Sequence, residues 1–310
     1  MNEFELIEKL TRSLPANKSV VTGPGDDCAV LDLGLPDKLL LFKTDALVEG
    51  IHFKSDTPPE KIGRKALARC LSDIAAMAGT PTAALITIAL PKNFDAAHVE
   101  AIYSGIIALA RKQDVAIAGG ETTTNPERIL ISVALIGHVA RGKAPLRSGA
   151  EAGDAIFVTG ELGGSLAGRH LEFEPRLAEG RWLVEHFPIH AMIDLSDGLA
   201  GDLRHILKAS RVGAELLTAS IPISRAAKIA SKAESSAKPP LLAALTDGED
   251  FELLFTVASR DAVPLLDAWK IQFPKIPLTC IGKITAGEGI NLRDKSGARP
   301  LTAHGYEHFA

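Results

Sequence analysis

The chain has 310 residues, a formal net charge of -4 and 46% hydrophobic residues, which is enough for a large core and for two domains. The slightly acidic balance, with Lys and Arg scattered, excludes the basic surface that nucleic-acid or anionic-membrane binding requires. Three distant cysteines, Cys28, Cys70 and Cys280, form no CxxC pair, which argues against a zinc site or a disulfide framework. With no signal-peptide pattern and no apolar run of membrane-spanning length, we expect a soluble cytoplasmic protein.

Strand and helix patterns alternate through the first half of the chain. Hydrophobic periodicity predicts a helix over 2–13, a strand over 39–45 that ends in an acid, a helix over 61–79, a strand over 83–91, a helix over 95–114 and strands over 115–120 and 129–139. The segment 141–154 is rich in Gly, Pro and charge, which is typical of a domain boundary.

The second half repeats this mixture. The pattern predicts a strand over 155–160, a helix beginning in GGSLAGRHLEF (163–173), a strand over 190–198, a helix over 199–213 that ends at its glycine, a surface helix and loop over 224–240, and strands over 251–257 and 278–284. Both halves therefore combine strands with helices, and we expect two α/β domains.

Acidic residues beside Gly, Ser or Thr recur along the chain. They occur in GDD (25–27), TD (44–45), SD (72–73), GGETT (119–123), DLSDG (194–198) and DGED (247–250). Several follow an apolar strand directly, and strand ends lie at the rim of a sheet, where ligands usually bind. Mg²⁺ prefers oxygen ligands, and converging carboxylates stay ionised readily only if cations lie among them. The pattern indicates a site for divalent ions and a polyphosphate.

Each acidic pair also has an ordinary structural explanation. A GD or SD pair is most often a turn or a helix N-cap, and about one lone pair in five is expected to be functional. Asp194 and Asp197 stand between a strand and a helix, so a capping role for one of them is the simplest interpretation. Asp73 lies inside an apolar helix, where capping does not explain it.

Other common catalytic motifs are absent from the sequence. There is no Walker A loop, protein-kinase signature, GxSxG elbow or HExxH spacing. The glycine-rich stretch 159–168 follows a strand, where its amides could hold a phosphate, but tight strand–helix packing explains the glycines equally well.

Seven blocks resemble the thiamine-monophosphate kinase family, in that family's order. They are GPGDDCAV (23–30), KTDALVEGIHF (43–53), LSDIAAMAGTP (71–81), GGETT (119–123), LRSGAEAGDAIFVTG (146–160), IDLSDGL (193–199) and GEDFELLFT (248–256), and the tail GYEHFA (305–310) is similar as well. The broader superfamily includes aminoimidazole ribonucleotide synthetase and selenophosphate synthetase.

The resemblance implies an α/β (α+β) fold of two domains, of the aminoimidazole ribonucleotide synthetase type. Residues 1–142 would form an N-terminal domain with a mixed sheet, which binds ATP and magnesium and forms the core of a homodimer. Residues 143–310 would form an α/β domain that completes the nucleotide and substrate site. ATP, several Mg²⁺ ions and thiamine monophosphate are the ligands that the resemblance implies.

The resemblance also assigns roles to individual residues. Positions that match metal ligands are Asp27, Thr44, Asp45, Asp73, Glu121, Asp194 and Asp197. Positions that match ATP contacts are Gly120, Glu121, Arg147, Ser196 and Tyr103. Positions that match the thiamine phosphate pocket are His52, Glu249 and Tyr306.

Two residues depart from the family pattern. Glu121 stands where the family usually has Asp, which moves the carboxylate outward by about 1.5 Å. Lys43 stands where the family usually has a small hydroxyl residue at a metal; a protonated Lys cannot be a ligand, so it either replaces part of a cation's charge or points away.

The implied reaction transfers a phosphoryl group from ATP to thiamine monophosphate. The acceptor phosphate has its second pKa near 6, so it needs no general base, and Mg²⁺ and Arg147 would offset the repulsion between the two anions. Two alternatives are another ATP-dependent synthetase of the superfamily and a nonenzymatic protein that binds ATP or thiamine phosphate.

Overall fold

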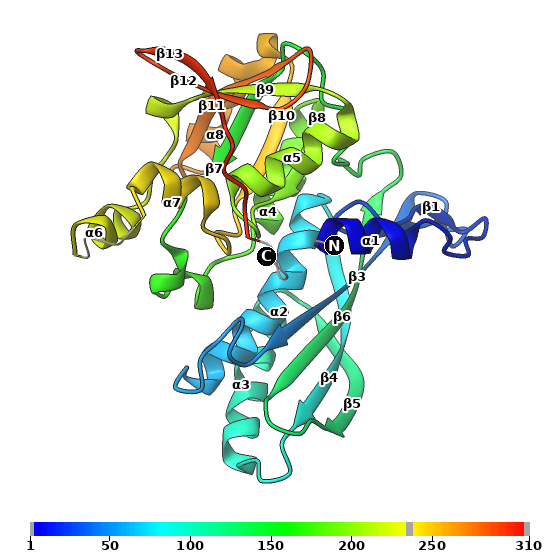
Figure 1. The fold of residues 1–310 in the computed structure, drawn as a ribbon. Helices are drawn as coiled ribbons and strands as arrows, with labels where there is room; N and C mark the ends of the chain where they lie inside the picture. Colours follow the sequence, from blue (N-terminus) through cyan, green and yellow to red (C-terminus); the bar gives the residue numbers. More distant parts are fainter. Residues whose placement is uncertain (1–2, 234–237, 307–310) are drawn as a thin grey trace.

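The structure is a computed structural model that describes residues 3–233 and 238–306. It contains two mixed sheets, one built from strands before residue 141 and the other from strands after residue 154 (Figure 1). Segment 141–154 contains no helix or strand. No helix in the described ranges combines the length and apolarity needed to cross a bilayer.

The first sheet has six strands in the order β1-β2-β3-β6-β4-β5. They are β1 (Val20–Thr22), β2 (Ala29–Leu31), β3 (Lys38–Val48), β4 (Thr80–Leu90), β5 (Ala116–Thr124) and β6 (Leu130–Ala140). All neighbours are antiparallel except β4 and β5. Helices α2 (Pro59–Ala76) and α3 (Ala96–Lys112) cover one face of this sheet (Figure 1).

The two helices pack unusually closely because glycines lie at their crossing. A Cβ on Gly63 of α2 would overlap with the carbonyl oxygen of Ile102, and a Cβ on Gly105 of α3 would overlap with that of Glu60. Pro59 occupies the first position of α2, and Asp95 caps α3 by accepting from Ala97 N at 3.0 Å. These features fix where α2 begins and how deeply it sits.

The second sheet has seven strands in the order β13-β12-β9-β11-β7-β10-β8. They are β7 (Ala155–Thr159), β8 (Ile189–Asp194), β9 (Gly213–Leu217), β10 (Leu253–Val257), β11 (Leu278–Thr285), β12 (Ile290–Asp294) and β13 (Gly297–Pro300). The helices of this part are α4 (Leu177–His186), α5 (Leu199–Ser210), α6 (Arg225–Ala233), α7 (Pro240–Thr246) and α8 (Ala262–Gln272). Every residue of β7 and β10 is buried.

Helix α2 connects the two halves of the core. One cluster of buried residues joins Leu71 of α2 and Ile86 of β4 to Phe157 and Phe255 of the second sheet. A second cluster lies on the other face of the second sheet and includes Leu203 of α5. Both faces of the second sheet are therefore buried, and α2 lies between the two sheets (Figure 1).

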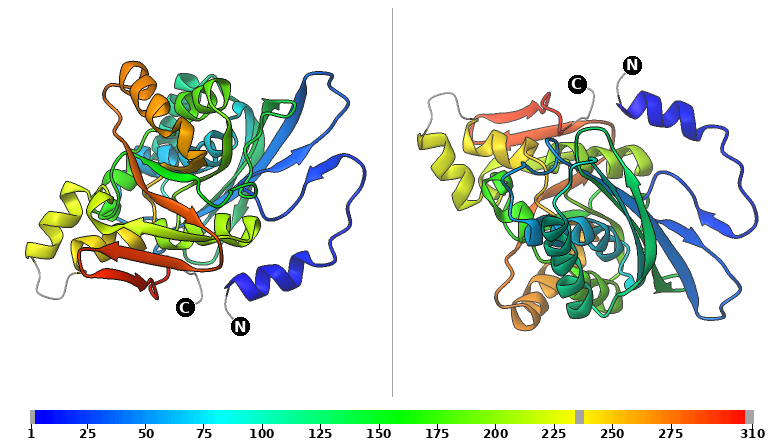
Figure 2. Two further views of the ribbon diagram at one scale, coloured as in Figure 1. Left: turned by 90° about the horizontal axis from the view of Figure 1, so that it is seen from above. Right: turned by 90° about the horizontal axis from the view of Figure 1, so that it is seen from below.

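Helix α1 (Glu3–Thr11) projects to one side of the molecule in both views of Figure 2. Its Glu8 lies 3.8 Å from Lys208 of α5, and both side chains are exposed. The contact adds little stability, because exposed ion pairs are screened by water.

Several predicted elements need correction. The helix expected over 163–173 is wrong: two short 3₁₀ turns (Ser165–Ala167 and Arg169–Leu171) replace it, because Gly163, Gly164 and Gly168 have positive φ values of 80°, 67° and 134°. The glycine expected to end the helix over 199–213 instead begins β9.

The region 224–240 contains α6 and the start of α7, with residues 234–237 outside the described part of the chain. Pro240 opens α7 at its first position instead of closing a loop. The tail positions 307–310 and the first residue of the helix expected over 2–13 also lie outside the described residues.

Candidate metal and phosphoryl-transfer site

Three predicted metal ligands converge at the junction of the two sheets. Asp27 lies in the turn before β2, Asp73 lies on α2, and Asp194 is the last residue of β8. One carboxylate oxygen from each lies within 4.8 Å of the others. The three residues are buried, with relative exposures of 2%, 7% and 4%. Distant parts of the sequence thus supply one group of oxygen ligands.

Crowding and burial oppose ionisation of these acids. Burial, reinforced by the carboxylate of Asp27, raises the pKa of Asp194 to about 7. Burial raises the pKa of Asp73 well above its usual value, although the Lys43 ammonium opposes this. Burial and Asp27 raise the pKa of the neighbouring Asp26 to about 6. Like charges held this close are stabilised by a cation.

The donor set suits a hard divalent ion. Oδ2 of Asp27 is buried and has no hydrogen-bond partner among the described residues, although an unpaired buried oxygen is costly. Oδ1 of the same carboxylate accepts from Arg147 Nη2 at 2.6 Å. Asp194 accepts from the Ser72 hydroxyl at 2.6 Å. The site therefore has an oxygen free to bind an ion such as Mg²⁺.

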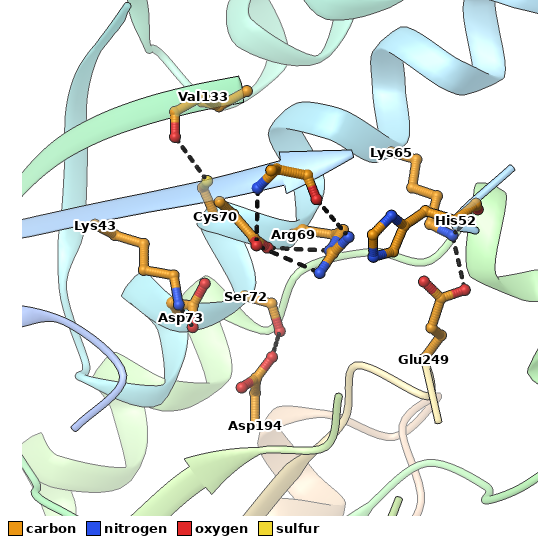
Figure 3. Close-up of polar contacts among 12 residues, drawn as sticks. Lys43, His52, Lys65, Arg69, Cys70, Ser72, Asp73, Val133, Asp194 and Glu249 are labelled. Atoms are coloured by element: carbon orange, nitrogen blue, oxygen red, sulfur yellow. Dashed lines mark hydrogen bonds and ion pairs between the residues drawn. The ribbon is translucent and has the colours of Figure 1, made fainter. Parts of the chain in front are cut away.

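Asp45 lies beside this group but is paired with an arginine. It is inside β3, not at the end of a strand as expected, because the strand continues to Val48. Its carboxylate lies 3.0 Å from Arg69 Nε of α2. Lys43, two residues earlier on the same strand, lies 2.8 Å from Asp73 (Figure 3). Burial lowers the pKa of Lys43, but Asp73 and Asp45 outweigh it, so that this pKa is raised.

Thr44 and Glu121 lie on the opposite face of the first sheet. Successive side chains on a strand alternate between faces, so Thr44 points away from the face of Lys43 and Asp45; its hydroxyl lies 3.5 Å from that of Ser132. Glu121 pairs with Thr87, and Thr87 pairs with Ser132. The structure thus does not bring Thr44 or Glu121 to the acids of the same chain.

Gly120 lies in the same cross-strand row as Asp45, through Val133 and Ile86. Three strand spacings separate Gly120 and Asp45, about 14 Å. A Cβ on Gly120 would overlap with the carbonyl oxygen of Ile86, which explains the glycine structurally. Tyr103 of α3 packs against the hydrophobic core, and burial raises its pKa.

Asp197 belongs to a second group, with Asp202 and His205 of α5. One ligand atom from each lies within 4.8 Å of the others. Asp197 N donates to Asp202 Oδ2 at 3.1 Å. Neither Asp194 nor Asp197 caps α5, since the N-cap is Gly198 and no side chain caps the helix, so the simplest sequence interpretation was wrong.

Two of the predicted substrate residues, His52 and Glu249, contact a buried lysine. Lys65 Nζ, with no exposed side-chain surface, donates to Glu249 Oε2 at 2.7 Å and to the backbone oxygen of His52 at 2.5 Å (Figure 3). It also lies 2.8 Å from His170 Nδ1. Glu249 is buried, which raises its pKa, but His170 and Lys65 outweigh this and lower the pKa to about 2.

The backbone carbonyls of Ser196 and Asp197 accept hydrogen bonds from Glu249 and Tyr306. Glu249 N donates to Ser196 O at 2.7 Å, and Tyr306 N donates to Asp197 O at 2.8 Å. Glu249 has a left-handed φ of 63°, a conformation that a non-glycine residue adopts only where its surroundings impose it. The backbone of Tyr306 therefore lies close to that of Glu249, although its side chain is about half exposed.

The sequence interpretation missed five residues around these groups. They are Lys65, Arg69, His170, Asp202 and His205. A signal for two of them was present, because positions 65, 69 and 73 are spaced i, i+4, i+8 and so share one face of the helix. Asp202 looked like an ordinary acid in a first helical turn.

Comparisons with known proteins agree with this architecture. The family described as "AIR synthase related protein, N-terminal domain" matches residues 25–139. Curated thiamine-monophosphate kinases from Rhodopirellula baltica and Escherichia coli K12 are 43% and 37% identical to this chain. The alignments cover 90% and 99% of this chain and 87% and 98% of those proteins.

A solved structure described as "AaThiL complexed with AMPPCP and TMP" matches with a TM-score of 0.78 at 32% identity. The match covers 99% of this chain and 97% of that one. The expected fold class is confirmed by this match. Identity of this level over nearly the full length confirms the resemblance as well: the chain belongs to the thiamine-monophosphate kinase family.

Proposed function

We propose that the protein is an ATP-dependent kinase that converts thiamine monophosphate to thiamine diphosphate, the last step of thiamine diphosphate biosynthesis. The observation that carries the proposal is the convergence of Asp27, Asp73 and Asp194, with an unpartnered buried oxygen on Asp27. Buried carboxylates in one place need a cation, and cations that bridge carboxylates to phosphates are what phosphoryl transfer requires.

Mg²⁺ is the ion that this oxygen-only donor set suits best. Asp27, Asp73 and Asp194 would hold it, with Asp45 and Asp197 in neighbouring positions. Bound Mg²⁺ would supply charge neutralisation for the phosphates of ATP. Thr44 and Glu121 stay sequence-based predictions, because their side chains project from the other face of the first sheet.

Arg147 is suited to contact the phosphates directly. One nitrogen of its guanidinium pairs with Asp27, which fixes its position, while Nε is buried and has no hydrogen-bond partner among the described residues. An anionic oxygen would satisfy that donor. Gly120, Glu121, Ser196 and Tyr103 complete the predicted ATP contacts.

His52, Glu249 and Tyr306 are proposed to contact thiamine monophosphate. The negative charge of Glu249 and the ring of Tyr306 both suit a cationic thiazolium. Burial, together with Arg69, lowers the pKa of His52 to about 4, so this histidine is neutral and a weak base at pH 7. The acceptor phosphate is already largely dianionic, and transfer proceeds in line without a phosphoenzyme.

The assembly is proposed to be a cytoplasmic homodimer of two-domain subunits, divided at residues 142 and 143. The uncovered face of the first sheet supports the dimer. Phe42 and Leu85 are exposed there by 46% and 50%, and apolar side chains exposed on one sheet face are typical of an interface.

The test is an assay of ADP release by the purified protein with ATP and Mg²⁺. We expect release with thiamine monophosphate and none with thiamine, because only the former carries the acceptor phosphate, and ³¹P NMR should show a new diphosphate. Release with another phosphate or amide acceptor alone would favour a different synthetase. Binding of ATP without any turnover would favour a nonenzymatic protein.

A further inference from the structure

Two partly buried cations face two of the predicted metal ligands. Strand β3 carries Lys43 and Asp45, and helix α2 carries Arg69 and Asp73. Lys43 Nζ lies 2.8 Å from Asp73 Oδ1, and Arg69 Nε lies 3.0 Å from Asp45 Oδ2. The side chains are 10–26% exposed. Each element thus contributes one positive and one negative group to a crossed double ion pair.

The distance between the two charged residues along β3 matches the distance between the two charged residues along α2, so both ion pairs can form together. Residues two apart on a strand are about 6.6 Å apart, and residues four apart on a helix are about 6 Å apart along its axis. Lys43 and Asp45 therefore lie opposite Asp73 and Arg69 at matching intervals, with the strand and the helix running in opposite directions. The guanidinium also donates to the backbone oxygen of Ala46 at 3.1 Å, which fixes Arg69 in this position.

A divalent ion between Asp45 and Asp73 would have to displace these cations. An ammonium at 2.8 Å occupies the position next to Asp73 Oδ1 that an ion would take, and it repels a second positive charge. The same holds for the guanidinium at Asp45. Asp27 also has a cationic partner, because Arg147 occupies its Oδ1 at 2.6 Å, but its buried Oδ2 has no hydrogen-bond partner among the described residues, so the cluster keeps an open oxygen on that side.

We propose that Lys43 and Arg69 are built-in cations that replace a divalent ion between Asp73 and Asp45, so that ion binding is confined to the group formed by Asp27, Asp73 and Asp194. The ammonium of Lys43 and the guanidinium of Arg69 thus neutralise part of the negative charge of the site without a metal ion. The inference rests on the proposed function only in taking these acids as the metal site, and it is tested without substrates.

The experiment counts bound Mn²⁺ in the nucleotide-free protein by electron paramagnetic resonance. In Lys43→Ser the ammonium is lost and Asp73 is freed, so we expect one more bound Mn²⁺ than in the wild type, or binding tighter by at least about tenfold. Arg69→Gln, an independent variant, should gain an ion at Asp45. Adding Asp73→Asn to Lys43→Ser should remove the gained ion, which assigns it to that carboxylate.

Two matched controls distinguish the effect of losing the charge at position 43 from the effect of a substitution as such. Lys43→Arg keeps the positive charge and should keep the wild-type count. Lys38→Ser removes an exposed lysine from the same strand and should also leave the count unchanged. Equal counts and affinities in the wild type, Lys43→Ser and Arg69→Gln would overturn the proposal.

If neither Lys43→Ser nor Arg69→Gln folds, a comparison of the wild type with Asp45→Asn decides the question. Loss of a tightly bound Mn²⁺ on Asp45→Asn substitution would then overturn the inference, because it would show an ion where we place a guanidinium. An unchanged count would support it. A kinase assay on the wild type is a separate measurement, so failure of the proposed activity and failure of the built-in cations give different results.

Discussion

Asp73 and Asp194 are both buried carboxylates of the acid cluster, but their partners differ in charge. Asp73 faces the ammonium of Lys43, whereas Asp194 accepts a hydrogen bond from the Ser72 hydroxyl. Burial raises the pKa of both acids. Removing the charge of Asp73 also leaves the Lys43 ammonium without its partner, whereas removing the charge of Asp194 relieves the cost of burying that charge and its repulsion from Asp27. The two acids are therefore expected to differ in how their removal changes stability, because only Asp73 has a cationic partner that would be left unpaired.

Substitution of each acid by asparagine should separate these contributions. Both variants should lose turnover. Asp73→Asn should lower the free energy of unfolding by about 3 kcal/mol. Asp194→Asn should raise it above pH 7, because the raised pKa of Asp194 means that its ionised form destabilises the fold there. Urea unfolding at pH 8 measures both, and equal losses of stability in the two variants would contradict the pairing described here.

His205 makes stability depend on pH. Burial, with Arg147 nearby, lowers its pKa to about 4, below the ordinary value of about 6.5. The unfolded chain therefore takes up the proton first, so the stability that neutral His205 provides is complete above pH 6.5 and is lost as the pH falls toward 4.

The variant His205→Gln should lose less stability than the wild type between pH 7 and pH 5, measured as the difference between two urea unfolding curves. His304→Gln is the matched control, since His304 is exposed, and its decline should parallel that of the wild type. A decline of wild-type steepness in His205→Gln would show that this histidine does not carry the effect.

At the scale of elements, α2 organises the site. Lys65, Arg69 and Asp73 share one face of this helix and reach Glu249, Asp45 and Lys43 respectively. All three contacts form only if α2 packs closely against its neighbours. Glycines permit this close packing: Gly63 of α2 lies against α3, and Gly180 of α4 lies against the carbonyl oxygen of Ala75 of α2. Its position and the site geometry therefore depend on one another.

The substitution Gly63→Ala should disturb both the position of α2 and the geometry of the site. The new Cβ would overlap with the Ile102 carbonyl oxygen, so the helices must separate; overpacking of this kind costs about 1–3 kcal/mol. We expect a lower melting temperature together with reduced turnover, because α2 carries the site residues. Gly23→Ala, whose Cβ would meet only Val20 at an ordinary 3.7 Å, is the control. Unchanged stability in Gly63→Ala would show that the contact can relax.

Sequence patterns predicted the long elements well and their relation to the acids less well. The apolar runs that became α2, α3, β4 and β6 were clear because their periodicity is set by burial on one face. Asp45 was expected at a strand end but lies inside β3, since a strand continues through polar residues when its neighbour supplies hydrogen bonds. Strands β12 and β13 were missed because short elements carry little periodic signal, and the 11-residue helix α8 was missed as well.

At the scale of the whole molecule, two sheets meet around α2 and the site lies at their junction. The sequence resemblance predicted the fold and the convergence of Asp27, Asp73 and Asp194. It did not predict that Thr44 and Glu121 project from the other face of the first sheet, because strand register is set by pairing between distant segments. The same long-range packing determines which charged residues pair with the acids.

The open face of the first sheet leads to a prediction about assembly. Phe42 and Leu85 lie on it with Ile136 and Ala134 in adjacent cross-strand rows. A charge in the middle of an apolar interface is left without a partner on dimerisation, so Leu85→Glu should convert the proposed dimer into monomers in sedimentation velocity while its circular dichroism spectrum stays that of the wild type. Ile271→Glu is the control, because Ile271 is 84% exposed on α8 and should leave the dimer intact. If Leu85→Glu sediments as a dimer, the two subunits meet elsewhere, and the apolar face has another role.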